Sequence, residues 1–164
     1  MHRFVMALVC TPFIFAGVDQ DWAALEALKG EWVGVGTGKP GDGSGSFTFV
    51  PEMHGRIYVR RNHADYPPSE GRPAFRHEDF MTVYREGDVV KADYVDNEDH
   101  VIRYVVKGTD QGIDFVSAAD SKTHRYRMRY VLDGNNKMKM RFDIAPPGKP
   151  DQFTNYIESE LLRK

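Results

Sequence analysis

Short apolar stretches recur along most of this sequence at intervals of about ten residues, and residues that favour turns separate them. The separating segments include Glu86-Gly87-Asp88 and Asp133-Gly134-Asn135, where glycine and short polar side chains allow the chain to reverse. This regular punctuation is typical of an antiparallel all-β meander. The predicted strands cover residues 31–37, 46–51, 56–63, 76–85, 88–95, 100–107, 112–117, 124–132, 137–144 and 156–163.

An open sheet with this many strands would expose two long unpaired edges. Closing the sheet removes both edges, so the sequence predicts a single up-and-down β-barrel of about ten strands. A barrel of this size either holds a small ligand or is filled by its own side chains. A second domain is not expected, because only a short tail follows the proline-rich segment 146–150.

The N-terminal segment has a different composition from the rest of the chain. Residues 4–18 carry no charge and follow a basic start, which is typical of a secretory signal peptide. The run is too short for a membrane-spanning helix, which needs roughly 20 apolar residues. We therefore expect a signal peptide over residues 1–18, cleaved near 16–18, and a barrel domain over residues 19–164 of a secreted or periplasmic protein. The alternative is a buried N-terminal helix.

Composition and motifs exclude several functional classes. The 22 Lys+Arg and 24 Asp+Glu residues give a net charge of −2, whereas a dedicated nucleic-acid binder would be basic. Cys10 is the only cysteine and lies in the predicted leader, so the mature domain would have no thiol for catalysis or a disulfide. The glycine-rich segment 34–40 has Pro40 where a phosphate-binding loop needs Ser or Thr. We predict no cofactor.

A short helix is predicted over residues 21–29, before the first strand. Trp22, Leu25 and Leu28 recur there with helical spacing, and Gly30 is a stop signal.

The segment Gly30-Glu31-Trp32 resembles the Gly-x-Trp opening of the calycin superfamily, which includes lipocalins, fatty-acid-binding proteins and nitrobindin-like barrels. The resemblance implies a lipocalin-like barrel in which Trp32 closes one end and stacks against an arginine of the last strand. Arg163 has a suitable position and shares its strand face with Leu161. Nitrobindin-like proteins hold haem through a histidine near the C-terminus, but the last histidine here is His124, so haem is not expected.

The barrel interpretation predicts an interior that binds a small hydrophobic or amphipathic molecule. In the predicted strand 56–63, Arg61 and His63 alternate in phase with the apolar Ile57 and Val59. We therefore expect Arg61 and His63 to line the upper cavity, with Arg61 holding a carboxylate or phosphate head group. The alternative is that the interior side chains fill the core completely. The predicted apolar lining is Phe47, Phe49, Tyr94, Tyr104, Phe115, Tyr126, Met128, Tyr130, Met140 and Phe142.

A different class of function, a barrel enzyme, is the second hypothesis. His63, Tyr66 and His77 lie at predicted strand ends beside several carboxylates, and they are the candidate catalytic residues. The same residue types could hold a divalent metal, but they more often form capped turns and surface pairs, so we predict no metal. The enzyme hypothesis requires the three side chains to converge around a cavity.

The clearest alternation lies in residues 124–132 and 137–144, where aromatic and methionine side chains take one face and basic side chains the other. A three-residue loop, Asp133-Gly134-Asn135, is expected to pair Tyr130 with Met138 and Met128 with Met140.

That register places like charges opposite one another on the outer face, Arg129 with Lys139 and Arg127 with Arg141. Like charges so placed are destabilising, so this face needs acidic neighbours or an anionic partner. Neutralisation by Asp143, Glu158 and Glu160 would make it an ordinary solvated surface. The third hypothesis is an envelope interaction module that uses this Arg125–Arg141 face.

Overall fold

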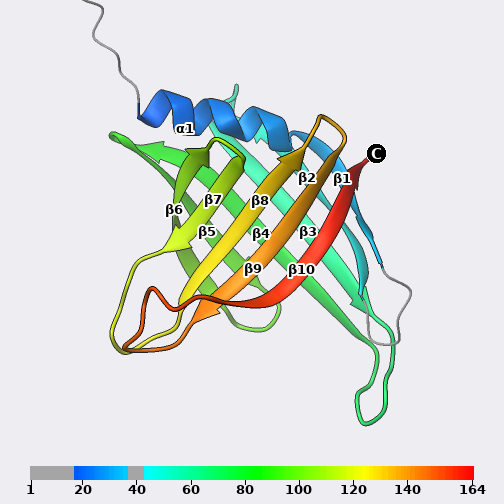
Figure 1. Ribbon diagram of the computed structural model, residues 1–164. Helices are drawn as coiled ribbons and strands as arrows, with labels where there is room; N and C mark the ends of the chain where they lie inside the picture. Colours follow the sequence, from blue (N-terminus) through cyan, green and yellow to red (C-terminus); the bar gives the residue numbers. More distant parts are fainter. Residues whose placement is uncertain (1–16, 37–42) are drawn as a thin grey trace, which may run out of the picture.

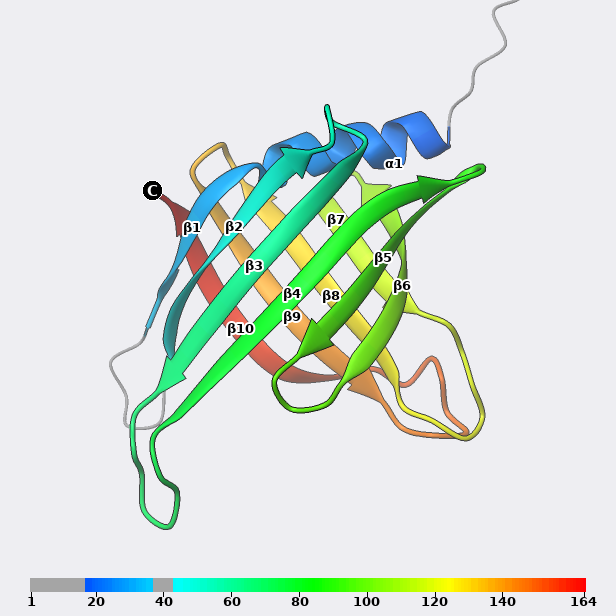
Figure 2. The ribbon, with the colours of Figure 1, turned by 180° about the vertical axis from the view of Figure 1, so that it is seen from behind.

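The computed structural model describes residues 17–36 and 43–164. These residues form a closed antiparallel barrel with the strand order β1-β10-β9-β8-β7-β6-β5-β4-β3-β2, and β1 pairs with both β2 and β10 (Figures 1 and 2). One short helix precedes the strands. The predicted all-β, up-and-down barrel of ten strands with an N-terminal helix is therefore confirmed.

The helix α1 spans Val18–Ala24 and continues into a 3-10 turn, η1, over Leu25–Leu28. Each strand predicted from the sequence is present, with ends displaced by at most three residues. The strands are β1 Gly30–Val35, β2 Ser44–Glu52, β3 Ile57–Tyr66, β4 Phe75–Glu86, β5 Val89–Asp96, β6 Val101–Thr109, β7 Gly112–Ser117, β8 Arg125–Asp133, β9 Lys137–Ala145 and β10 Thr154–Arg163.

Most of the predicted leader, residues 1–16, lies outside the described residues. Gly17 precedes α1, and Val18, which begins it, is partly buried against the core. Among the described residues, no helix is long and apolar enough to span a membrane.

The helix lies across one end of the barrel (Figure 1). Leu25 and Leu28 of η1 are fully buried there. Asp21 accepts hydrogen bonds from the Gly108 backbone N–H and from Lys107 Nζ, each at 2.8 Å, and so ties α1 to β6. A Cβ on Gly108 would lie 3.1 Å from Ala24 Cβ, so the helix packs closely against β6 at this glycine.

Trp32 completes this closed end of the barrel. Its ring is fully buried, and its Nε1 donates a hydrogen bond to Leu28 O at 2.8 Å. The Arg163 guanidinium carbon lies 4.2 Å from the ring centroid. Arg163 also donates to Ala27 O and Asn135 O, so the arginine joins the end of β10 to η1 and to the β8–β9 loop.

The β8–β9 hairpin has the predicted faces but not the predicted register. Tyr130 lies opposite Met140, and Met128 lies opposite Phe142, so the register predicted from a loop at 133–135 is wrong by two residues. Asp133 pairs with Lys137, which leaves residues 134–136 as the loop. A shift of two residues keeps every side chain on its own side of the sheet, and this is why the interior face was predicted correctly.

The outer face of this hairpin is neutralised by neighbouring carboxylates. Arg127 pairs with Asp143 at 2.8 Å, and Arg129 pairs with Asp114 at 2.7 Å. Arg141, which lies opposite Arg129, is 3.4 Å from Glu158. The predicted like-charge pairs Arg129–Lys139 and Arg127–Arg141 are absent from this register, and the ion pairs favour the solvated-surface alternative over an anionic partner.

Candidate functional site

A buried ion pair lies in the interior, among aromatic rings. Arg60 of β3 and Asp79 of β4 are both almost inaccessible to solvent, and Arg60 Nη1 donates a hydrogen bond to Asp79 Oδ1. Asp79 also accepts from Asn62 Nδ2 at 2.7 Å. The Arg60 guanidinium carbon lies 5.0 Å from the Phe47 ring centroid. Burying two charges is costly, so this pair marks the region where the interior departs from a simple apolar core.

The alternation of β3 places Tyr58, Arg60 and Asn62 inside, which reverses the orientation predicted from Ile57 and Val59. Arg61 faces outward, with its side chain 57% exposed and its Nη1 3.4 Å from Glu52. It also lies over the outer Phe80 ring. The expectation that Arg61 lines the cavity is therefore wrong.

His63 alternates in phase with Arg61, so it lies on the outer face. The expectation that His63 lines the upper cavity is therefore also wrong. His77 of β4 contacts Asp79 and Tyr94 from the inner side. Tyr66 stacks on Phe75 near the tips of β3 and β4, with ring centroids 6.4 Å apart. The three candidate catalytic residues do not converge around one cavity, which removes the geometry that the enzyme hypothesis requires.

Among the described residues, two buried polar atoms near the middle of the barrel have no hydrogen-bond partner. They are Arg60 Nε and Tyr104 Oη. Burial raises the pKa of Tyr104 well above its usual value, so its hydroxyl stays protonated and is available as a donor. An unsatisfied buried donor costs about 1–3 kcal/mol. The interior therefore offers two donors to an acceptor that residues 17–36 and 43–164 do not provide.

Electrostatics keep the central pair ionised. Burial works against the charged form of Asp79, but the Arg60 charge and the hydrogen bonds from His77 and Asn62 together outweigh it and lower the pKa of that carboxyl. Burial also works against the Arg60 cation, but Asp79 and the surrounding tyrosines together outweigh burial, so the pKa of Arg60 is raised. Asp79 thus neutralises Arg60 in a low-dielectric surrounding, and a hydrogen bond from the remaining donor of Arg60, Nε, is stronger there than in water.

Polar groups continue from this pair to the barrel end opposite the helix, which we call the mouth. Tyr94 Oη lies 3.2 Å from His77 Nε2 and donates to Asp96 Oδ2 at 3.1 Å. The hydrogen bond to Asp79 raises the pKa of His77; partial burial opposes this shift and Glu98 adds to it. His77 is consequently protonated over a wider pH range than a free histidine.

The other side of the mouth is apolar. Tyr126 of β8 and Phe142 of β9 are partly buried and stacked, with ring centroids 5.9 Å apart. Tyr156 of β10 lies edge-on to Phe142 and is 68% exposed. The mouth thus has a polar side on β4 and β5 and an aromatic side on β8 to β10.

The predicted apolar lining residues all belong to the interior core or pack against it. Buried members are Phe47, Phe49, Tyr94, Tyr104, Phe115, Met128 and Tyr130, and partly buried ones are Tyr126, Met140 and Phe142. The sequence reasoning missed Arg60, Asn62 and Asp96 as interior residues. The sequence of β3 carried a signal for Arg60 and Asn62, because both lie on the same strand face as the aromatic Tyr58.

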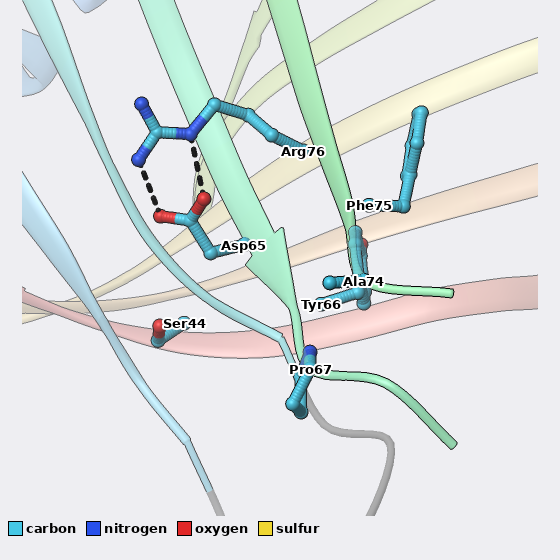
Figure 3. A pocket seen from close by; sticks show the side chains of 7 residues that line it. All are labelled: Ser44, Asp65, Tyr66, Pro67, Ala74, Phe75 and Arg76. Carbon is cyan, nitrogen blue, oxygen red and sulfur yellow. Dashed lines mark hydrogen bonds and ion pairs between the residues drawn. The ribbon is translucent and has the colours of Figure 1, made fainter. Parts of the chain in front are cut away.

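Two pockets of the described residues lie away from Arg60. The larger, of about 560 Å³, lies at the tips of β3 and β4, where Asp65 and Arg76 form a two-point ion pair (Figure 3). The smaller, of about 300 Å³, lies beside the β6–β7 turn. The larger pocket is lined by Ser44, Asp65, Tyr66, Pro67, Ala74, Phe75 and Arg76.

A scan against protein-family models finds no match for the chain, and a search of curated proteins also finds none. The closed ten-stranded antiparallel barrel with a short N-terminal helix is consistent with a calycin-like fold.

Proposed function

We propose that the barrel binds a small amphipathic molecule with an anionic head group, and that the head group accepts hydrogen bonds from Arg60 and Tyr104. The observation that carries this proposal is the pair of buried donors Arg60 Nε and Tyr104 Oη, which have no partner in the part of the chain that the structure describes. A carboxylate fits because it accepts several hydrogen bonds and complements the guanidinium charge.

The apolar part of the ligand packs against the aromatic interior and leaves toward the aromatic side of the mouth, at Tyr126 and Phe142. Each buried methylene contributes about 0.8 kcal/mol. Methionine side chains such as Met128 and Met140 are flexible enough to adjust to a chain that enters the core. Aromatic side chains already occupy the interior, so entry requires them to change rotamer.

Calorimetric titration with three ligands of equal chain length tests the charge preference: decanoate, decanol and decylamine. Decanoate is expected to bind most tightly and decylamine least, because Arg60 Nε and Tyr104 Oη are donors and an ammonium group cannot accept a hydrogen bond. Equal affinity for decanoate and decylamine, or no binding of any of them, would overturn the proposal.

The Tyr104→Phe variant removes one donor with little change in volume, and it is expected to weaken decanoate binding about tenfold to a hundredfold, the value of one hydrogen bond to a charged group. Tyr84→Phe is the matched control. Its hydroxyl donates to Asp93, also a carboxylate, but it lies on the outer face of β4, so decanoate affinity is expected to stay unchanged.

We also propose that the protein acts outside the cytoplasm, since the uncharged run of residues 4–18 supports an export signal. Expression of the full chain in a bacterium, followed by N-terminal sequencing of the periplasmic product, tests this. A product that starts at about residue 17–19 is expected from where such signals are cleaved. An uncleaved chain that stays in the cytoplasm would contradict it.

A further inference from the structure

A second cluster, separate from the central donors, lies at the polar side of the mouth. His77 of β4, Asp96 at the end of β5 and Glu98 in the following turn each present a ligand atom, and these atoms all lie within 4.8 Å of one another. We propose that this cluster, the mouth triad, binds one divalent transition-metal ion, and we take Zn²⁺ as its representative.

The histidine is held in the way that metal-binding histidines are held. His77 Nδ1 lies 2.7 Å from Glu98 Oε1, and Nε2 lies 3.2 Å from Asp79 Oδ2. A carboxylate on the second ring nitrogen fixes the ring orientation and makes the first nitrogen a stronger ligand. Asp79 is itself held in place by Arg60, so Nε2 of His77 stays bonded to Asp79. The other ring nitrogen, Nδ1, faces Glu98 and is the one that can bind the ion.

Asp96 supplies a rigid carboxylate that lacks a strong counter-charge. Its side chain is only 4% exposed, and it accepts hydrogen bonds from the backbone N–H groups of Glu98 and His100, each at 2.9 Å. Within residues 17–36 and 43–164, no lysine or arginine forms an ion pair with Asp96 or Glu98, and their ion-pair partners are histidines. A buried carboxylate without a permanent cation favours a bound positive ion.

His100 stands next to the mouth triad. Its Nδ1 lies 2.9 Å from Asp96 Oδ2, and its side chain is half exposed. It is therefore within reach as a further nitrogen ligand after a rotation of its ring.

The donor set selects the class of metal. One imidazole nitrogen with two carboxylates suits Zn²⁺ and related first-row ions, whereas Ca²⁺ and Mg²⁺ prefer oxygen ligands throughout. Three protein ligands leave one tetrahedral position for water or another small ligand.

Calorimetric titration of the metal-free full chain with zinc chloride, in the absence of any alkyl ligand, tests the proposal independently of the central site. Binding of one ion per chain is expected, and an excess of Ca²⁺ is expected not to compete. His77→Ala and Glu98→Gln are each expected to weaken Zn²⁺ binding at least about tenfold. Loss of a metal ligand should weaken binding more than loss of a group that only orients a ligand, which itself costs about tenfold or more.

His124→Ala is the matched control, because His124 is an exposed histidine at the same end of the barrel but outside the mouth triad. Zn²⁺ affinity of this variant is expected to equal that of the parent chain. Circular dichroism checks that each variant is folded, and Glu98→Gln, in an exposed turn, provides the test if His77→Ala unfolds. No Zn²⁺ binding by the parent chain, or binding unchanged in a folded triad variant, would overturn the proposal.

Discussion

The two ends of the barrel are built from the same ten strands but bury different kinds of side chain. At the helix end, Leu25, Leu28 and Trp32 are buried, and the polar atoms of Trp32 and Arg163 find partners in the backbone. Toward the mouth, the interior changes to Arg60, Asp79, His77 and Asp96, and some of its donors have no partner among the residues described. The helix end therefore accounts for stability, whereas the mouth half carries polar groups that an optimally stable core would not contain.

The largest effect is expected at the helix end. Trp32→Ala removes a fully buried ring together with its contact to Arg163, so we expect a loss of about 3–5 kcal/mol in the free energy of unfolding, measured by urea denaturation. Val33 follows Trp32 in β1 and is exposed on the outer face, so Val33→Ala should change the free energy of unfolding by less than about 0.5 kcal/mol. A cost for Trp32→Ala below 1 kcal/mol would mean that this end does not dominate stability.

A comparable loss is expected from breaking the central ion pair. Asp79→Leu leaves Arg60 buried without a counter-charge and should cost about 3–5 kcal/mol. The double variant with Arg60→Met removes both charges and should recover that loss, because an apolar pair of similar volume is often as stable as a buried ion pair.

The double variant also separates stability from binding. We expect it to fold at least as well as the parent chain but to lose its preference for decanoate over decylamine. Retained preference in a stable double variant would place the recognition of charge elsewhere.

Acid should loosen the mouth half before the helix end. Burial works against ionisation of Asp143, but hydrogen bonds from Arg127 and Asn155 outweigh it and lower its pKa. A carboxyl with a lowered pKa stabilises the fold fully when the pH is above its pKa in the unfolded chain, which is about 4. This contribution, on the order of 1 kcal/mol, is lost as the pH falls through the lowered pKa of the folded state.

Hydrogen exchange measured between pH 5 and pH 3, corrected for its intrinsic pH dependence, should therefore show protection lost first where β8, β9 and β10 meet at the mouth, around Asp143. Asp143→Asn should remove this pH dependence. Protection lost first around η1 would contradict the comparison of the two ends.

The smallest effect on stability is expected from Tyr104→Phe. Its hydroxyl is buried without a partner, so removing it should leave the free energy of unfolding unchanged or raise it by about 1 kcal/mol. A substantial loss of stability would show that the hydroxyl has a structural partner, such as bound water.

Much of the fold could be predicted from the sequence because strand period and turn chemistry are local signals. The hairpin of β8 and β9 shows the limit of this reasoning. Two registers that differ by two residues place the same faces inside, and the choice between them depends on partners such as Asp114 and Asp143. Local alternation does not encode these partners.

The site was harder to predict because β3 has apolar residues on both faces. Ile57 and Val59 alternate with Tyr58, and an arginine on the Tyr58 face was not expected inside. Arg60 is buried because Asp79, on the neighbouring strand, provides its counter-charge. This pairing is tertiary, so the hydrophobic pattern pointed to Arg61 and His63 instead.

A co-crystal structure with an alkyl carboxylate that carries bromine at its far end would test the central claim most directly. The account predicts a carboxylate oxygen within hydrogen-bonding distance of Arg60 Nε and Tyr104 Oη, with the bromine signal on the Tyr126 and Phe142 side of the mouth. A ligand found only in the outer pocket at Asp65 and Arg76, with Arg60 Nε and Tyr104 Oη still unpaired, would contradict it.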